Sequence, residues 1–175
     1  MSSSFAHPVK LDQIGQGLRV ELSASDTERE DIARRLGLIS LDRLEAHAIL
    51  SRDGERVRAE GRVLASLGQS CVVTGEPVAA SIDEPFALDI LPEPKVGRPD
   101  AEIELRPEDC DIMFHDGASV DLGAAVVDSL ALALDPYPRC AGAEAALKEA
   151  GVISEEEAGP FAALAALRDK MGKQS

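Results

Sequence analysis

Aromatic residues are scarce in this chain of 175 residues. It has no tryptophan, one tyrosine and four phenylalanines, so aromatic side chains make up only 3% of the sequence. Single-stranded nucleic acids are commonly held by aromatic rings on which the bases stack, next to a cationic groove. The scarcity of rings disfavours that mode of binding. It also predicts an aliphatic core, because 45% of the residues are nevertheless hydrophobic.

Positive charge is also in short supply. The chain has 18 lysines and arginines against 32 aspartates and glutamates, which gives a net charge of −14. Proteins that follow a phosphate backbone draw their affinity from lysine and arginine, so extensive direct binding of nucleic acid is disfavoured. An acidic surface attracts basic proteins instead. The charge alone leaves open the alternative that it only keeps the protein soluble.

Cysteines and long apolar runs are few. The three cysteines, Cys71, Cys110 and Cys140, are odd in number and widely spread, which fits a reducing compartment rather than a disulfide framework. No uninterrupted apolar segment approaches the roughly 20 residues that span a bilayer. The first residues have neither a cationic start nor an apolar run. We therefore expect a soluble, cytoplasmic protein with no membrane partner.

Familiar catalytic motifs are missing. The sequence has no glycine-rich phosphate loop, no G-x-S-x-G elbow and no H-E-x-x-H pair. The stretch from Asp109 to Asp116, with Asp111 and His115, holds groups from which a metal-dependent hydrolase could be assembled. A single local stretch lacks the distant second half of most catalytic metal sites, so we favour a polar edge strand leading into a turn. We expect no enzyme activity and no cofactor, and keep the hydrolase as an alternative.

Turn and cap signals divide the rest of the chain into strands and helices. Asp26 begins a predicted helix whose first turn is acidic and whose last turn is basic, and Gly37 ends it. Asp53-Gly54 is suited to a tight turn between strands at 38–52 and 56–69. A second turn at 74–76 leads into a strand at 77–91, because Gly75 supplies the backbone freedom that a turn needs.

Helical periodicity follows the strands. Apolar residues at four-residue spacing behind Asp121 predict an amphipathic core helix that ends before Pro136; they are Leu122, Val126, Leu130 and Leu134. A last helix carries an apolar stripe that includes Phe161 and Leu164, which docks either on its own core or on a partner.

The predicted fold class is α+β. It is a mainly antiparallel, curled or barrel-like sheet with one packed helix and helical terminal segments. Residues 1–152 form a single domain, and residues 153–175 form a C-terminal helical tail. The loop at 92–102, rich in proline and charge, is too short to divide the chain further.

Three segments resemble a known family. They are "CVVTGEPVAASIDEPFAL", "VDLGAAVVDSLALALDPYPRC" and "GPFAALAAL". Their order and spacing resemble those of the YceD family, whose members are implicated in accumulation of large-subunit ribosomal RNA. The likeness spans residues 55–168. It is strongest at the cysteine turn, where Pro77 follows Gly75, and at the helix that ends in a proline-rich segment before Cys140.

The resemblance implies a cytoplasmic, non-enzymatic factor and raises the question of zinc. Many members have Cys-x-x-Cys at the turn and a later cysteine, which looks like part of a zinc site. Here Cys71 and Cys140 stand at those places, but Thr74 replaces the second turn cysteine. A structural zinc ion needs four ligands, and neither Cys110 nor His115 has suitable spacing, so we treat the two positions as degenerate and expect no metal.

Two interpretations of these thiols remain once a metal site is set aside. Buried, reduced thiols are favoured, because thiols pack well as small apolar groups. A reactive thiol would need a neighbouring histidine or lysine to lower its pKa, and the sequence near Cys71 has neither.

The predicted partner is a basic large-subunit ribosomal protein or a pre-ribosomal particle, with ribosomal RNA contacted indirectly. The candidate partner-binding residues are Cys71, Gly75, Pro77, Cys140, Phe161 and Leu164. The alternative is a direct RNA-binding module. It would require a group of arginines to gather on one surface: Arg34, Arg35, Arg43, Arg52, Arg56, Arg58 and Arg62.

Overall fold

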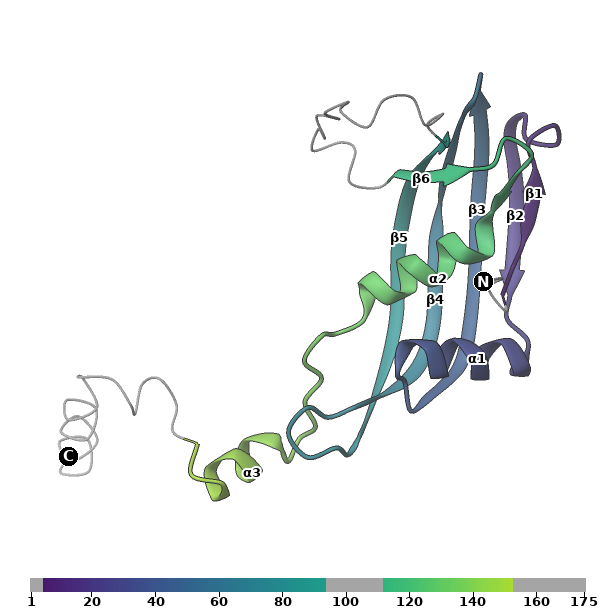
Figure 1. Ribbon diagram of the computed structural model, residues 1–175. Coiled ribbons are helices and arrows are strands. Elements are labelled where there is room, and N and C mark those ends of the chain that lie inside the picture. Colours follow the sequence, from purple (N-terminus) through teal and green to yellow (C-terminus); the bar gives the residue numbers. More distant parts are fainter. Residues whose placement is uncertain (1–4, 94–111, 153–175) are drawn as a thin grey trace, which may run out of the picture. The chain divides into compact units, whose positions relative to one another are not determined.

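The computed structural model describes residues 5–93 and 112–152 (Figure 1). The chain divides into two compact units, which are treated separately below. The sheet unit comprises residues 1–69 and 79–136, and the cysteine unit comprises residues 70–78 and 137–175. The helices and strands are β1 (Pro8–Lys10), β2 (Gln16–Ser23), α1 (Asp26–Leu36), β3 (Ser40–Asp53), β4 (Arg56–Ser70), β5 (Pro77–Pro92), β6 (Ile112–His115), β7 (Ser119–Asp121), α2 (Leu122–Ala133) and α3 (Ala143–Glu149).

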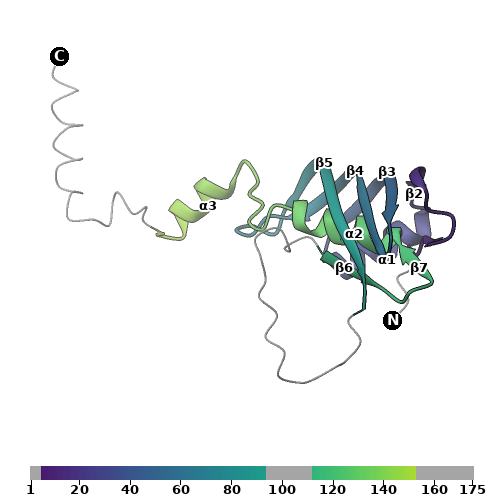
Figure 2. The ribbon, with the colours of Figure 1, turned by 90° about the horizontal axis from the view of Figure 1, so that it is seen from above.

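A five-stranded sheet in the order β2-β3-β4-β5-β6 forms the centre of the sheet unit (Figures 1 and 2). Strands β2, β3 and β4 pair antiparallel, whereas β6 pairs parallel to β5. Gly54 has a φ of 62° in the turn between β3 and β4, which confirms the turn predicted from Asp53-Gly54. Strands β1 and β7 pair antiparallel as a separate two-stranded ribbon.

Side chains alternate along the long strands between a buried face and an exposed face. On β4, Val57, Ala59 and Val63 are buried, while Arg56, Arg58 and Arg62 are exposed. The buried face joins residues of α1 and α2 in one aliphatic core, and Figure 1 shows α2 crossing the long strands. This period of two is expected for a sheet with one covered face.

The two long helices have the ends that the sequence predicts. Glu28 accepts hydrogen bonds from the Ser25 backbone N–H and hydroxyl at the start of α1, and Gly37 ends that helix with a φ of 67°. Asp121 caps α2 by accepting from the Ala124 N–H at 3.2 Å. The predicted core stripe is confirmed, because Leu122, Val126 and Leu130 are fully buried and Leu134 packs against them.

The predicted fold class is wrong. The described residues hold more strand than helix, 48% against 23%, with three helices rather than one packed helix, and no helical segment precedes β1 and β2 among them. The five-stranded sheet is mixed and does not close into a barrel, because β2 and β6 lie at its two edges without pairing to each other. Alternation along a strand shows which face is buried, but it carries no information on closure.

The predicted tail at 153–175 lies outside the described residues, so the boundary after residue 152 stays a prediction. Among the helices that the structure describes, none is long and apolar enough to cross a membrane.

Candidate functional site

The cysteine turn, residues 70–78, is held by its own backbone. The Cys71 N–H donates to the Glu76 carbonyl at 2.8 Å, and the Gly75 N–H donates to the Cys71 carbonyl at 2.9 Å. Gly75 has a φ of 76°, a conformation that strains any residue with a side chain. The turn predicted at 74–76 is therefore confirmed.

Cys71 and Cys140 meet in the cysteine unit although 69 positions separate them in the sequence. The Cys140 N–H donates to the Cys71 sulfur at 3.3 Å, and the Val72 N–H donates to the Pro138 carbonyl at 2.9 Å. Cys71 is 3% exposed and Cys140 is half-buried, and both are free thiols. The proline-rich segment thus brings Cys140 against the turn.

Two side chains of the turn contact the Cys140 sulfur. The Thr74 hydroxyl lies 3.2 Å from it, and the sulfur donates to the Glu76 carboxylate at 3.3 Å. Thr74 and Glu76 are also bonded to each other at 3.3 Å. One small network of hydrogen bonds therefore connects both thiols, the hydroxyl and the carboxylate.

Hydrogen bonds lower the pKa of the Cys71 thiol from 9.0 to about 6. The N–H of Cys140 contributes most, followed by the Thr74 hydroxyl, and the backbone N–H groups of Thr74 and Val73 add to it, while burial opposes the shift. Sequence reasoning looked for a histidine or lysine beside Cys71 and missed this environment. Backbone donors have no letter in the sequence, so no motif could have revealed them.

The side chains described at the turn do not supply the four thiolate or imidazole ligands of a typical structural zinc site. Two thiols are accompanied by one hydroxyl and one carboxylate, and a threonine hydroxyl is not among the ligands that zinc favours. Within residues 5–93 and 112–152, no three or more histidine, cysteine and acidic side chains are grouped so as to hold a metal ion. Cys110 lies outside the described residues.

Of the other candidate partner-binding residues, two lie on the turn and two lie outside the described residues. Gly75 and Pro77 are exposed on the turn, which leaves them accessible to a partner. Phe161 and Leu164 lie outside the described residues. Their role in binding stays a prediction.

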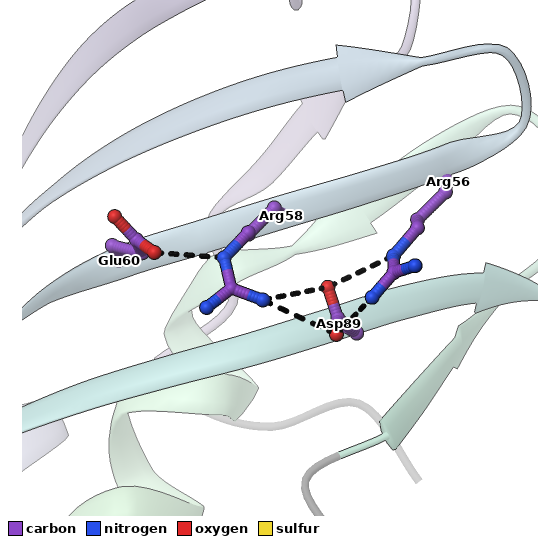
Figure 3. Close-up of polar contacts among 4 residues, drawn as sticks. All are labelled: Arg56, Arg58, Glu60 and Asp89. Atoms are coloured by element: carbon purple, nitrogen blue, oxygen red, sulfur yellow. Dashed lines mark hydrogen bonds and ion pairs between the residues drawn. The ribbon is translucent and has the colours of Figure 1, made fainter. Parts of the chain in front are cut away.

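A network of ion pairs joins β4 and β5 on the exposed face of the sheet (Figure 3). The Asp89 carboxylate on β5 accepts from Arg56 Nε at 3.0 Å and from Arg58 Nη1 at 3.3 Å. Arg58 Nε also donates to Glu60 at 2.7 Å. The side chain of Asp89 is only 15% exposed, so its charge is partly shielded from water by the two arginines.

The remaining arginines of the proposed RNA-binding group are also bonded. On the sheet, Arg62 pairs with Asp83 and Arg43 pairs with Glu45, both at 2.6 Å. The other pairs are Arg34 with Asp31 and Arg35 with Asp128, while Arg52 donates to the carbonyls of Leu11 and Gly54. A phosphate would have to displace carboxylates from most of these arginines. The arrangement disfavours the direct RNA-binding alternative.

Asp89→Asn is expected to lower the free energy of unfolding by about 1 kcal/mol at pH 7, because one partly shielded acceptor of two guanidinium groups loses its charge. Arg56 first and then Arg58 hold the pKa of Asp89 below its ordinary value of 3.8. A carboxyl with a lowered folded pKa stabilises the protein above its unfolded pKa, and that stability is lost as the pH falls through the folded value. The difference between the two proteins should therefore shrink below about pH 4.

Urea unfolding at several pH values measures this difference. Asp42→Asn is the matched control, since Asp42 is exposed and forms no ion pair within the described residues. Equal effects of the two substitutions at pH 7 would contradict the prediction.

The candidate hydrolase region holds its histidine in a structural role. His115 is 4% exposed; its Nε2 lies 2.9 Å from the Glu55 carbonyl, and its Nδ1 accepts from the Gly117 N–H at 3.0 Å. Asp116 accepts from the N–H groups of Ala118 and Ser119, which lower its pKa. Asp109 and Asp111 lie outside the described residues. Both ring nitrogens of His115 thus form hydrogen bonds with backbone groups, as expected where a strand leads into a turn.

A groove between α1 and the start of β3, here called the α1 groove, was not found by sequence reasoning. It encloses about 750 Å³, and its lining includes Leu38, Ile39, Leu41, Glu30 and Asp42. Ile39 is 50% exposed, so part of its apolar side chain is open to solvent. The groove brings together apolar and acidic side chains that no single motif contains.

Comparison with known proteins gives one match. The model of a family described as "Large ribosomal RNA subunit accumulation protein YceD" matches residues 59–168. This range is more than half of the chain, includes both the cysteine turn and α2, and confirms the resemblance drawn from the sequence. Searches of curated proteins and of solved structures found no match.

Proposed function

Because the chain belongs to the YceD family, we propose that it is a cytoplasmic, non-enzymatic factor of ribosome biogenesis that binds a basic large-subunit ribosomal protein or a pre-ribosomal particle. The family's description, accumulation of the large ribosomal RNA subunit, supports the biological role. Binding would protect the large-subunit RNA indirectly. Ribosomal proteins bound by this chain would be available to assemble with the RNA, and assembly would limit loss of the RNA.

The balance of charge supports a protein partner. The chain has a net charge of −14, and most arginines of the sheet unit are already bonded to its own carboxylates. The surplus carboxylates leave a negative field, which speeds encounters with cationic proteins and slows encounters with RNA.

The α1 groove is the surface that best suits a basic polypeptide. Its floor includes Leu38 and Leu41, and its acidic side chains Glu30 and Asp42 form no ion pair within the described residues. The two arginines of the groove are paired, Arg29 with Asp26 and Arg34 with Asp31. An apolar floor beside open carboxylates complements a segment in which basic and aliphatic residues alternate. The exposed turn residues Gly75 and Pro77, with Cys71 and Cys140, are a second proposed contact.

The function is tested by capture from growing cells. Tagged protein purified at low salt, with and without ribonuclease, is expected to bring basic large-subunit ribosomal proteins with it, and high salt should release them because the contact is electrostatic. Depletion of the protein should lower the ratio of large-subunit to small-subunit ribosomal RNA. Recovery of no ribosomal protein at either salt would remove the mechanism, and an unchanged RNA ratio would remove the biological role.

The double substitution Glu30→Lys with Asp42→Lys is expected to weaken binding of the captured basic protein by about tenfold at low salt, because it places two cations beside a cationic ligand. Asp53→Lys with Glu55→Lys is the matched control. It changes the net charge equally, at the exposed turn between β3 and β4. Affinity is measured by calorimetry; an equal loss in both variants would show that only overall charge matters and would reject the α1 groove.

A further inference from the structure

The two thiols of the cysteine unit lie in different hydrogen-bonding environments. The Cys71 sulfur accepts a hydrogen bond from the Cys140 N–H at 3.3 Å, and hydrogen bonding by the Thr74 hydroxyl and by the N–H groups of Thr74 and Val73 helps to lower the pKa of this thiol. Such a set of donors stabilises a thiolate. The Cys140 sulfur instead donates to the Glu76 carboxylate, which requires its proton. One sulfur thus accepts hydrogen bonds, and the other donates one to a carboxylate.

The backbone of Cys140 also lies close to the Cys71 sulfur. The Cys140 nitrogen lies 3.3 Å from the Cys71 sulfur, and an N–Cα bond of about 1.46 Å then places the Cys140 Cα within about 4.8 Å of it. The Thr74 hydroxyl lies 3.2 Å from the Cys140 sulfur and also helps to lower the pKa of Cys71. In a disulfide the Cα of one cysteine is joined to the sulfur of the other through one Cβ and one sulfur, so this separation lets rotation of the Cys140 side chain bring its sulfur to that of Cys71.

From this geometry we propose that Cys71 and Cys140 form a peroxide-sensitive thiol pair, in which Cys71 is oxidised first and Cys140 resolves it to an intramolecular disulfide. The lowered pKa of Cys71, about 6, supports the assignment, because much of this thiol is then ionised at neutral pH. Cys71 is only 3% exposed, so the site selects a small oxidant and excludes bulky disulfides such as oxidised glutathione.

The chemistry balances in two steps. The Cys71 thiolate attacks one oxygen of the peroxide, the O–O bond breaks, and sulfenic acid forms while the released oxygen takes a proton to become water or an alcohol. The Cys140 thiol then loses its proton to Glu76, and its sulfur attacks the Cys71 sulfur. The S–O bond breaks, and hydroxide leaves with the proton from Glu76 as water. The peroxide is reduced by two electrons, and the two thiols are oxidised by two.

The disulfide would fix the cysteine turn covalently to the segment that follows Pro138. In the reduced protein that connection consists of single hydrogen bonds, such as those from the Cys140 N–H and from the Val72 N–H. A reductant of the thiol class restores the open state. Oxidation would therefore make the exposed turn more rigid while leaving the residues that it contacts the same.

The test uses the full chain with Cys110→Ser, which leaves one pair of thiols. Treatment with hydrogen peroxide should remove both thiols, lower the intact mass by two hydrogen atoms and yield a Cys71–Cys140 peptide on non-reducing digestion. Dithiothreitol should reverse all three changes. Oxidation that yields only disulfides between molecules, or leaves Cys71 reduced while free glutathione is oxidised, would overturn the proposal.

Three variants in the same background separate the roles. With Cys140→Ser, Cys71 should accumulate as sulfenic acid that dimedone captures, whereas with Cys71→Ser the oxidation of Cys140 should be at least about tenfold slower. Glu76→Gln should leave the first step unchanged and prolong the sulfenic acid, which raises dimedone capture. Faster oxidation of Cys140 than of Cys71 would reverse the assignment. If a variant fails to fold, as circular dichroism would reveal, the peptide map of the parent protein still decides.

Discussion

Gly61→Ala is expected to lower the free energy of unfolding by about 3 kcal/mol, which is large for the addition of one methyl group. Gly61 lies within β4, where it pairs with Ala48 of β3. A Cβ at this position would collide with the carbonyl oxygen of His47, and it would lie 2.8 Å from Cζ of Phe86 and 2.9 Å from Cα of Ala48. Two of these three obstacles are backbone atoms of the neighbouring strand, so relief requires a shift of the β3–β4 ladder.

Gly15→Ala is the matched control. A Cβ at Gly15 meets nothing within 4 Å, and its backbone is outside the left-handed region. Both substitutions reduce the freedom of the unfolded chain equally, so this contribution cancels in the comparison, and Gly15→Ala is expected to be neutral or to stabilise by about 0.5 kcal/mol. Denaturant unfolding of both variants gives the values. A loss below about 1 kcal/mol for Gly61→Ala would show that the ladder yields easily.

Local signals in the sequence predicted the local structure. The chain turns at Asp53-Gly54 and at Gly75, and α2 begins at the cap residue Asp121, as predicted. These features were predictable because each depends on neighbours within a few residues. Sheet closure failed as a prediction, since it depends on whether β2 meets β6, and no periodicity records that. The pairing of Gly61 with the ring of Phe86 was missed for the same reason.

The candidate site was predictable only in part. The resemblance pointed to Cys71 and Cys140, and the structure brings them together. What distinguishes the two sulfurs are backbone N–H groups and the positions of Thr74 and Glu76 around them, which depend on the conformation of the turn rather than on residue types. Sequence reasoning also found the arginines, but not Asp89, a bridge that lies 33 positions from Arg56.

Leu130→Ala is expected to cost about 3.5 kcal/mol of unfolding free energy, because it combines the lost transfer of a buried isobutyl group with a cavity. Leu130 is fully buried in α2, where it belongs to the aliphatic core shared with the long strands. With aromatic residues at only 3% of the chain, few large side chains are present to relax into the space. Thermal and urea unfolding should both register the loss.

Leu132→Ala, two positions further along α2, separates burial from every other effect of the same substitution. Leu132 is 85% exposed, so its truncation removes little apolar surface from the core, and alanine is at least as good a helix former as leucine. We expect a change of less than about 0.5 kcal/mol. Similar losses at the two positions would contradict the prediction, because burial is the property that distinguishes them. A large loss at Leu130 alone would show that packing against the sheet stabilises α2.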